Sequence, residues 1–286
     1  MNKSEEMADL LAEHYSSVFQ TEVLPMEEMD QVCDGDRLLL DTQFSEFFVR
    51  LQLSRLRETL ATGPDGIYAR LLKRTCIFTA DALSDVFNSL LHQSKVPLIW
   101  MDSHITPTYK PGKVKTEPAA YRPIGVTCTL GRIFERKIND AIDHHLETNS
   151  LIDDSQHGFR RGRSCETNLL ALMEYHAQRA EEGDNEDDCN FDLKAFLDGI
   201  PHQRCLAALN AHGVSQEGKI HKWITAWLGA GGEMMEQGAR GRSQEKEQGA
   251  TAQNLGVGAG SKDSEDTAKE RSKGQHWQKC SQTLVI

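Results

Sequence analysis

The distribution of large apolar residues along the chain sets the strongest limit on its fold. Between Gly229 and Ser281 only Leu255 and Val257 belong to the set Leu, Ile, Val and Phe, and Gly, Gln, Glu, Lys and Ser dominate. Such a segment cannot bury enough apolar surface to offset the entropy lost when it becomes ordered. The sequence therefore predicts that a packed core forms upstream of this segment and that residues 229–286 are disordered.

Apolar stripes with helical spacing dominate the earlier part of the chain. Apolar residues recur at intervals of three or four in five segments, which is typical of amphipathic helices. The stripes are Leu10, Leu11, Tyr15 and Phe19; Phe44, Phe47, Phe48 and Leu51; Leu83, Val86, Phe87, Leu90 and Leu91; Leu130, Phe134, Ile138, Ile142 and Leu146; and Ile220, Trp223, Ile224, Trp227 and Leu228. Two more helices are expected to end at Gly183 and to run from Pro201 to Gly213. Pro97 is expected to stop the third stripe's helix.

The segment between His104 and Thr129 has a different pattern. Its letters HITPTYKPGK and AAYRPIGVTCT are typical of two short extended pieces around a basic Pro-Gly turn. Upstream of it, Gly-Pro-Asp-Gly in ATGPDGIYARLL indicates a turn before a helix. Together with the apolar stripes, these features predict a helix-rich α+β chain.

Charge and cysteine content restrict the classes of function. The formal net charge of −11 argues against nucleic-acid binding when it is averaged over the chain, although an average can hide a local patch. Seven cysteines without a C-x-x-C pair favour neither a disulfide framework nor a zinc site, so we expect an intracellular protein, nuclear or cytoplasmic. The acidic N-terminus does not fit a signal peptide, and no apolar run approaches the ~20 residues that span a bilayer.

Positive charge gathers locally between Tyr109 and Arg163. The cations of this patch are Lys110, Lys113, Lys115, Arg122, Arg160, Arg161 and Arg163. Prolines and glycines among them leave backbone N–H groups exposed beside the cations, a combination that suits phosphate. A solvated basic turn in an acidic protein would carry the same charges, so charge alone leaves both interpretations open. Trp223 and Trp227 have rings that can stack on bases, but their helical spacing favours core packing.

The order of several motifs resembles a known family. The series ITPTYKPGK, AAYRPIGVTCTLGRIFERKI, LIDDSQHGFRRGRSCETNL and DLKAFLDGIPHQRCLAALNAHGV, with GPDGI before it and KWITAWL after it, resembles the reverse transcriptase domain of LINE-like, non-LTR retrotransposons. The resemblance covers Met7 to Leu228. It implies an RNA-directed DNA polymerase with a right-hand fold, an RNA template, a DNA primer, dNTP substrates and Mg²⁺. This chain would hold the fingers and an incomplete palm.

The resemblance also implies roles for individual residues. Nucleotide contacts fall on two basic residues of the extended pieces and on the QHGFR element, namely Lys110, Arg122, Gln156, Gly158, Phe159 and Arg160. Counting back from Pro201 places Asp192 on the catalytic, metal-binding aspartate and Asp198 on a second, structural aspartate. The run before Asp192 is polar where the family has an apolar strand, so an exposed acid at the end of an acidic stretch is the alternative for Asp192.

Downstream of Leu228 the chain departs from the family pattern. Neither a Gly-Val-Pro-Gln-Gly-Ser element, nor an Ala-Asp-Asp hairpin, nor a thumb can be recognised, and the two Asp-Asp pairs, Asp153–Asp154 and Asp187–Asp188, both precede Asp192. Nucleotidyl transfer of this type uses two metal ions about 3.5–4 Å apart, which one carboxylate cannot hold. We therefore expect a truncated chain with weak Mg²⁺ binding and no polymerase activity by itself.

The expected organisation has three parts. Residues 1–60 form an N-terminal helical extension, residues 61–228 form the partial reverse transcriptase domain, and residues 229–286 form the disordered tail. The alternative functions are a non-catalytic nucleic-acid-binding remnant and a protein-interaction remnant whose helices pack on partners.

Overall fold

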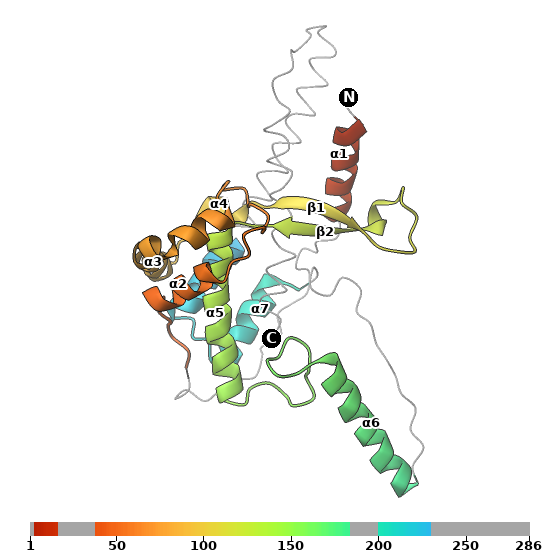
Figure 1. The fold of residues 1–286 in the computed structure, drawn as a ribbon. Helices are drawn as coiled ribbons and strands as arrows, with labels where there is room; N and C mark the ends of the chain where they lie inside the picture. The colour runs from red at the N-terminus through yellow and green to blue at the C-terminus, as the bar shows by residue number, and fades with distance from the viewer. Residues whose placement is uncertain (1–2, 17–37, 184–199, 230–286) are drawn as a thin grey trace.

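The computed structural model describes residues 3–16, 38–183 and 200–229, and Figure 1 shows their arrangement. In chain order the elements are α1 (Lys3–Ser16), α2 (Glu46–Ser54), α3 (Ala69–His92), α4 (Leu98–Met101), β1 (His104–Tyr109), the 3₁₀ turn η1 (Pro118–Ala120), β2 (Tyr121–Val126), α5 (Thr129–Thr148), α6 (Cys165–Glu182) and α7 (His202–Ala211). A last helix covers residues 219–229. The helix-rich α+β prediction is confirmed for the described residues. Among these helices, none combines the length and the apolar character that crossing a membrane requires.

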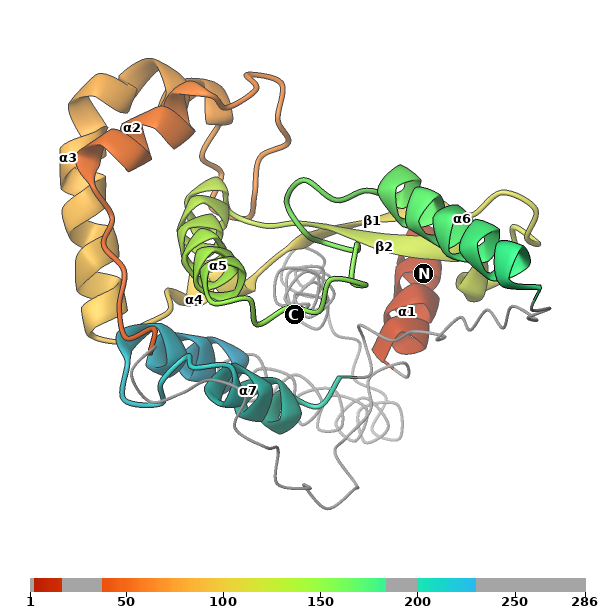
Figure 2. The ribbon, with the colours of Figure 1, turned by 90° about the horizontal axis from the view of Figure 1, so that it is seen from below.

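Helix α5 lies at the centre of the core. Its buried positions include Phe134, Ile138, Ile142 and Leu146, which are four of the five residues in the predicted stripe. Helices α2 and α3 lie on one side of α5 and α7 lies on the other (Figures 1 and 2). An i, i+4 stripe winds slowly around a helix, so one continuous row can contact neighbours on more than one side.

An aromatic cluster joins these elements. The ring of Phe134 lies 4.5 Å from Phe44, 5.6 Å from both Phe87 and Trp100, and 4.7 Å from Trp223, measured between centroids. The Trp223 indole N–H donates to the Lys95 carbonyl at 3.2 Å. The tryptophans of residues 219–229 are therefore buried, which confirms the core-packing interpretation over base stacking.

The short segment before α2, residues 38–45, contacts both α3 and the chain around residues 213–219. Leu39 forms a parallel bridge with Val214, and the Lys219 N–H donates to the Leu40 carbonyl at 2.8 Å. Asn88 on α3 exchanges two hydrogen bonds of 2.9 Å with the backbone of Phe44. Residues distant in sequence thus hold the helix over residues 219–229 against α3 and α5.

Two helix boundaries differ from the prediction. Helix α3 ends at His92, and Pro97 is instead the N-cap of α4. The reason is a Schellman motif after α3, in which Ser94 has a φ of 51° and the Lys95 N–H donates to the Leu90 carbonyl. Pro201 is the N-cap of α7 rather than its first residue. The predicted ending at Gly183 is confirmed, with a left-handed φ of 80°.

The Gly-Pro-Asp-Gly turn packs directly against the junction of β2 and α5. A Cβ atom on Gly63 would lie 2.7 Å from the Cys128 Cα and 2.8 Å from the Thr127 carbonyl oxygen. Gly66 closes the turn with a φ of 68° and donates its N–H to the Gly63 carbonyl at 3.1 Å. This turn therefore requires glycine for close approach as well as for its conformation.

Replacing Gly63 with Ala is expected to lower the free energy of unfolding by about 1–3 kcal/mol, because the new methyl group meets backbone atoms that cannot rotate away. Urea denaturation followed by circular dichroism would measure the change in midpoint. Gly229→Ala is the matched control, since no atom lies within 4 Å of a Cβ at that position. Equal midpoints for the two variants would contradict the packing argument.

Candidate nucleic-acid interface

The two-stranded sheet brings together two of the predicted basic site residues. Strands β1 and β2 are antiparallel, with Thr108 opposite Arg122 and Tyr109 opposite Tyr121, and the Lys110 N–H extends the ladder to the Ala120 carbonyl at 2.7 Å. Side chains alternate between the faces of a strand and directly opposed residues share a face. Lys110 and Arg122 therefore occupy the same face as diagonal neighbours.

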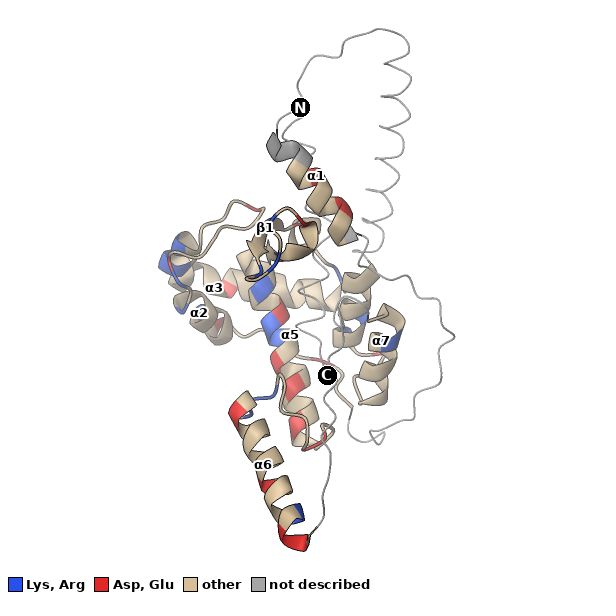
Figure 3. Cartoon of the chain, turned by 90° about the vertical axis from the view of Figure 1, so that its right-hand side faces the viewer, with Lys and Arg blue, Asp and Glu red and all other residues tan. Residues whose placement is uncertain are grey.

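The opposite face of this hairpin carries a pair of tyrosines that also contact Lys115. The Tyr109 and Tyr121 rings lie 5.8 Å apart, and the Lys115 ammonium lies 5.5 Å from the Tyr109 ring centroid. The Lys110 ammonium donates to the Ala119 carbonyl at 3.0 Å, and the Arg122 side chain is exposed. Lys113 and Lys115 are exposed in the turn after β1, where Figure 3 shows the blue of basic residues. The hairpin is thus a braced basic surface of the kind that binds phosphate.

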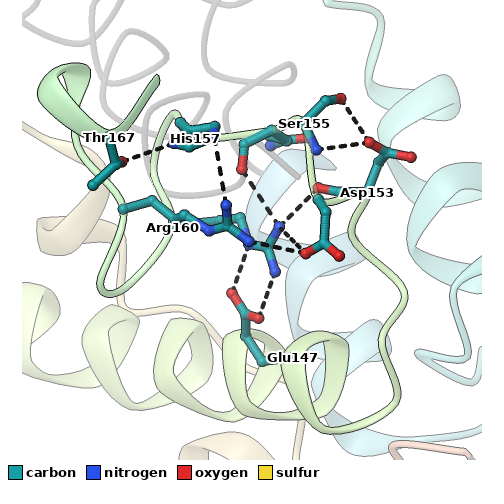
Figure 4. Close-up of polar contacts among 9 residues, drawn as sticks. Glu147, Asp153, Ser155, His157, Arg160 and Thr167 are labelled. Atoms are coloured by element: carbon teal, nitrogen blue, oxygen red, sulfur yellow. Dashed lines mark hydrogen bonds and ion pairs between the residues drawn. The ribbon is translucent and has the colours of Figure 1, made fainter. Parts of the chain in front are cut away.

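The loop between α5 and α6, residues 149–164, carries the QHGFR element and is fastened by Arg160. The Arg160 guanidinium donates to both carboxylate oxygens of Glu147, at 2.9 Å and 2.8 Å, and to the Asp153 carbonyl at 2.7 Å (Figure 4). We call the two bonds between Glu147 and Arg160 the Glu147–Arg160 clamp. The Arg160 side chain is only 10% exposed. A guanidinium engaged in this way holds the loop and has few donors left for a phosphate.

A second set of contacts completes the loop. His157 is buried, and its Nδ1 lies 2.8 Å from the Thr167 hydroxyl while its Nε2 lies 3.4 Å from an Arg163 Nη1 (Figure 4). The Thr167 hydroxyl donates to the Ser164 carbonyl at 2.9 Å, so it accepts the proton of His157 Nδ1, and Nε2 then accepts from Arg163. Arg163 also donates to Asp154 at 2.9 Å.

The remaining residues of the QHGFR element are placed differently from Arg160. Phe159 is 68% exposed and has a φ of 59°, and Gly158 is exposed beside it. Gln156 is half-buried, and its backbone carbonyl accepts from Arg160 at 3.4 Å. The loop therefore turns its aromatic ring outward and its first arginine inward. Glu147 and Asp154, which shape it, were not among the predicted site residues, although Asp154 lies within the quoted motif.

Comparisons with known proteins match the part of the chain that contains these residues. A family model described as reverse transcriptase (RNA-dependent DNA polymerase) matches residues 110–264, more than half of the chain. The chain belongs to the reverse transcriptase family. The match begins at Lys110 and continues past Leu228, the limit of the sequence resemblance.

Curated relatives of this chain indicate which type of reverse transcriptase it resembles. It is 27% identical over 204 residues to the probable RNA-directed DNA polymerase from transposon X-element of Drosophila melanogaster, covering 68% of this chain and 22% of that protein. It is 27% identical over 143 residues to the enzyme from transposon BS of the same species, covering 49% and 16%, and 24% identical over 154 residues to that from mobile element jockey, covering 54% and 17%. The chain thus spans about a fifth of their length. The predicted LINE-like, non-LTR type is confirmed.

The described residues of this reverse transcriptase chain do not form a binding site that suits Mg²⁺. Across residues 3–16, 38–183 and 200–229, no three His, Cys, Asp or Glu side chains form a group that could hold a metal ion. Asp192 and Asp198 lie outside the described residues, so their roles stay predictions. In the pair Asp153–Asp154, the first carboxylate accepts two hydrogen bonds from Ser155 and the second pairs with Arg163.

The Glu147–Arg160 clamp is expected to depend on pH. Hydrogen bonding by the Arg160 guanidinium lowers the pKa of the Glu147 carboxyl below its ordinary value of 4.5. The folded state thus favours the charged form, so the clamp stabilises the loop above that ordinary value and is lost as the pH falls through the lowered pKa.

Hydrogen exchange of peptides from residues 153–163 measures this dependence, with rates corrected for intrinsic chemistry. At about pH 6 the wild-type loop is expected to exchange more slowly than that of the Glu147→Gln variant, and the difference is expected to shrink as the pH falls below 4.5 through the lowered pKa of Glu147. A difference that persists unchanged into acid would show that the carboxylate charge does not hold the loop.

Proposed function

We propose that this chain is a fragment of a non-LTR reverse transcriptase that binds nucleic acid and nucleotide phosphates but does not synthesise DNA by itself. The proposed binding of phosphates rests on one observation, that Lys110 and Arg122 share a face of the hairpin. An ammonium and a guanidinium placed as diagonal neighbours can contact adjacent phosphate oxygens, while the tyrosines behind them brace the strands. The partners are an RNA template, a DNA primer and dNTP.

In this proposal the described elements correspond to the fingers and the start of the palm of a right-hand polymerase. Residues 1–60 form the extension, residues 61–228 the partial domain and residues 229–286 the tail. The order of the hairpin, α5 and the QHGFR loop along the chain supports the fingers assignment. The nucleotide contacts then come from Lys110, Arg122 and the outward part of the loop.

The proposed lack of polymerase activity rests on the carboxylates of the chain. By resemblance Asp192 is the metal-site aspartate, and a two-ion centre needs a second carboxylate that bridges the ions. The Asp153–Asp154 pair is engaged in loop contacts with Ser155 and Arg163, which supports excluding it from that role. Positioning and electrostatic stabilisation supply nearly all catalysis in such transfers, so an incomplete cage costs many orders of magnitude in rate.

Primer extension tests this proposal directly. The purified chain, a 5′-labelled DNA primer annealed to RNA, dNTP and Mg²⁺ are combined, and Asp192→Ala serves as the matched control. We expect the primer to be retarded in a native gel and to stay unextended with both proteins. Extension by the wild-type chain that Asp192→Ala abolishes would refute the inactivity. A primer–template that never shifts at low salt would refute the binding.

A further inference from the structure

Phe159 has an uncommon combination of conformation and exposure. Its φ of 59° lies in the left-handed region, which an aromatic residue rarely adopts, and its ring is 68% exposed. Burial of the ring cannot be the reason for this conformation. Strain of this kind persists where surrounding contacts fix the backbone, and it points to a role for the residue displayed.

The contacts that fix this backbone come from the neighbouring residue. Arg160 is joined to Glu147 by two charge-assisted hydrogen bonds, and the Arg163 N–H donates to the Arg160 carbonyl at 3.3 Å. Two parallel bonds to one carboxylate define the plane of the guanidinium as well as its position. The residue after Phe159 is therefore held in both side chain and backbone.

The anchor itself is rigid. Glu147 lies in the last turn of α5, directly after the buried Leu146. The helix closes in a Schellman motif in which the Leu151 N–H donates to the Leu146 carbonyl at 2.9 Å. The carboxylate thus projects from a fixed helix end, and the loop is attached to the core through it.

We infer that Glu147 is a positioning residue which, through Arg160, holds Phe159 outward to stack on an unpaired base of single-stranded nucleic acid. An exposed ring offers a stacking surface for any base, and such surfaces are typically accompanied by cations that follow the backbone. Arg161 can supply such a cation, since its side chain is 91% exposed and its guanidinium lies 3.9 Å from the Asp140 carboxylate. This inference rests on the proposed function, because it names the ligand of the same interface.

The direction in which Glu147→Ala changes RNA affinity distinguishes this inference from a purely electrostatic effect. Glu147→Ala removes a negative charge and frees a guanidinium, so charge alone would tighten RNA binding. Loss of positioning instead predicts binding weakened about fivefold or more, close to the effect of Phe159→Ala, since stacking on one base is worth roughly 5- to 150-fold in affinity. Fluorescence anisotropy of the full chain with a labelled oligouridine at fixed salt measures both.

Two further variants distinguish positioning from a general loss of structure. Arg160→Lys keeps the charge but lacks the two-pronged donor, so it is expected to weaken binding as Glu147→Ala does. Phe159→Trp keeps a stacking ring and is expected to bind within about twofold of the wild type. The double variant Glu147→Ala/Phe159→Ala is expected to bind no more weakly than Phe159→Ala, because both changes remove the same contact.

The outcomes also separate this inference from the proposed function. If the wild-type chain does not bind oligouridine at low salt, the proposed function fails and the stacking role fails with it. If the wild type binds and Glu147→Ala binds equally or more tightly, or if the effects of Glu147→Ala and Phe159→Ala add in full, the positioning role alone is overturned. Variants are compared only where their unfolding midpoints match the wild type.

Discussion

Replacing Phe134 with Ala is expected to lower the free energy of unfolding by about 3–5 kcal/mol, the range for removing a buried aromatic ring. The Phe134 side chain is fully buried, and its ring contacts aromatic side chains from four other segments, namely Phe44, Phe87, Trp100 and Trp223. The loss includes the transfer free energy of the ring and the cavity left behind, because these neighbours come from different elements and cannot all move inward.

Urea denaturation of the wild type and the variant gives the difference, with Phe78→Ala as the matched control. Phe78 lies on α3 and is 84% exposed, so the same chemical change there removes little buried surface and is expected to cost less than about 1 kcal/mol. Similar midpoints for Phe134→Ala and Phe78→Ala would mean that the aromatic cluster does not organise the core.

Long apolar stripes made much of this core predictable. The row from Leu130 to Leu146 predicted α5 and its buried face, because apolar residues spaced four apart line one side of a helix. On a strand the residues midway between them, which are polar here, would share the same face. The basic hairpin was predictable for a similar reason, since Pro-Gly between extended pieces specifies a reversal. Both signals are local in sequence. The helical spacing predicted that Trp223 is buried, but it did not predict that its ring packs against Phe134. An apolar stripe indicates burial and does not identify the partner.

Helix endings were less predictable. The Schellman motifs after α3 and α5 place Ser94 and Ser150 in the left-handed region, with φ of 51° and 54°. Glycine usually marks that position, and a serine gives no comparable signal. The next strong marker after α3 is Pro97, and a helix end predicted from it falls too late. After α6 the marker was Gly183, and the prediction was correct.

The sequence indicates candidate site residues, whose roles stay predictions, but not the structural partners of each residue. The resemblance selected Arg160 as a nucleotide contact, whereas the fold places it against Glu147, thirteen residues earlier in sequence. Such a pair forms only because α5 ends where the loop turns back, which no local pattern records. Asp192 and residues 230–286 lie outside the described residues. The role of Asp192 stays a prediction from resemblance, and the disorder of the tail stays a prediction from composition.

Replacing both Lys110 and Arg122 with Ala is expected to weaken binding of single-stranded RNA by about 10- to 100-fold near physiological salt, because each cation forms charge-assisted hydrogen bonds with phosphate. The two residues share one hairpin face, so a single strand can contact both. Each contact also releases counterions, and removing two is expected to reduce the slope of log affinity against log salt by about 1.4.

The matched control removes the same charge elsewhere. Arg50 on α2 and Arg70 on α3 have side chains that are 46% and 62% exposed, and these helices lie on the side of α5 away from the hairpin turn (Figure 2). Because their screened field is weak beyond a Debye length of about 8 Å, Arg50→Ala/Arg70→Ala is expected to leave the slope unchanged. Anisotropy titrations between about 50 and 200 mM salt give both slopes. Equal losses of affinity and slope in the two double variants would mean that RNA binding depends only on the net charge of the chain. The hairpin would then not be the binding surface.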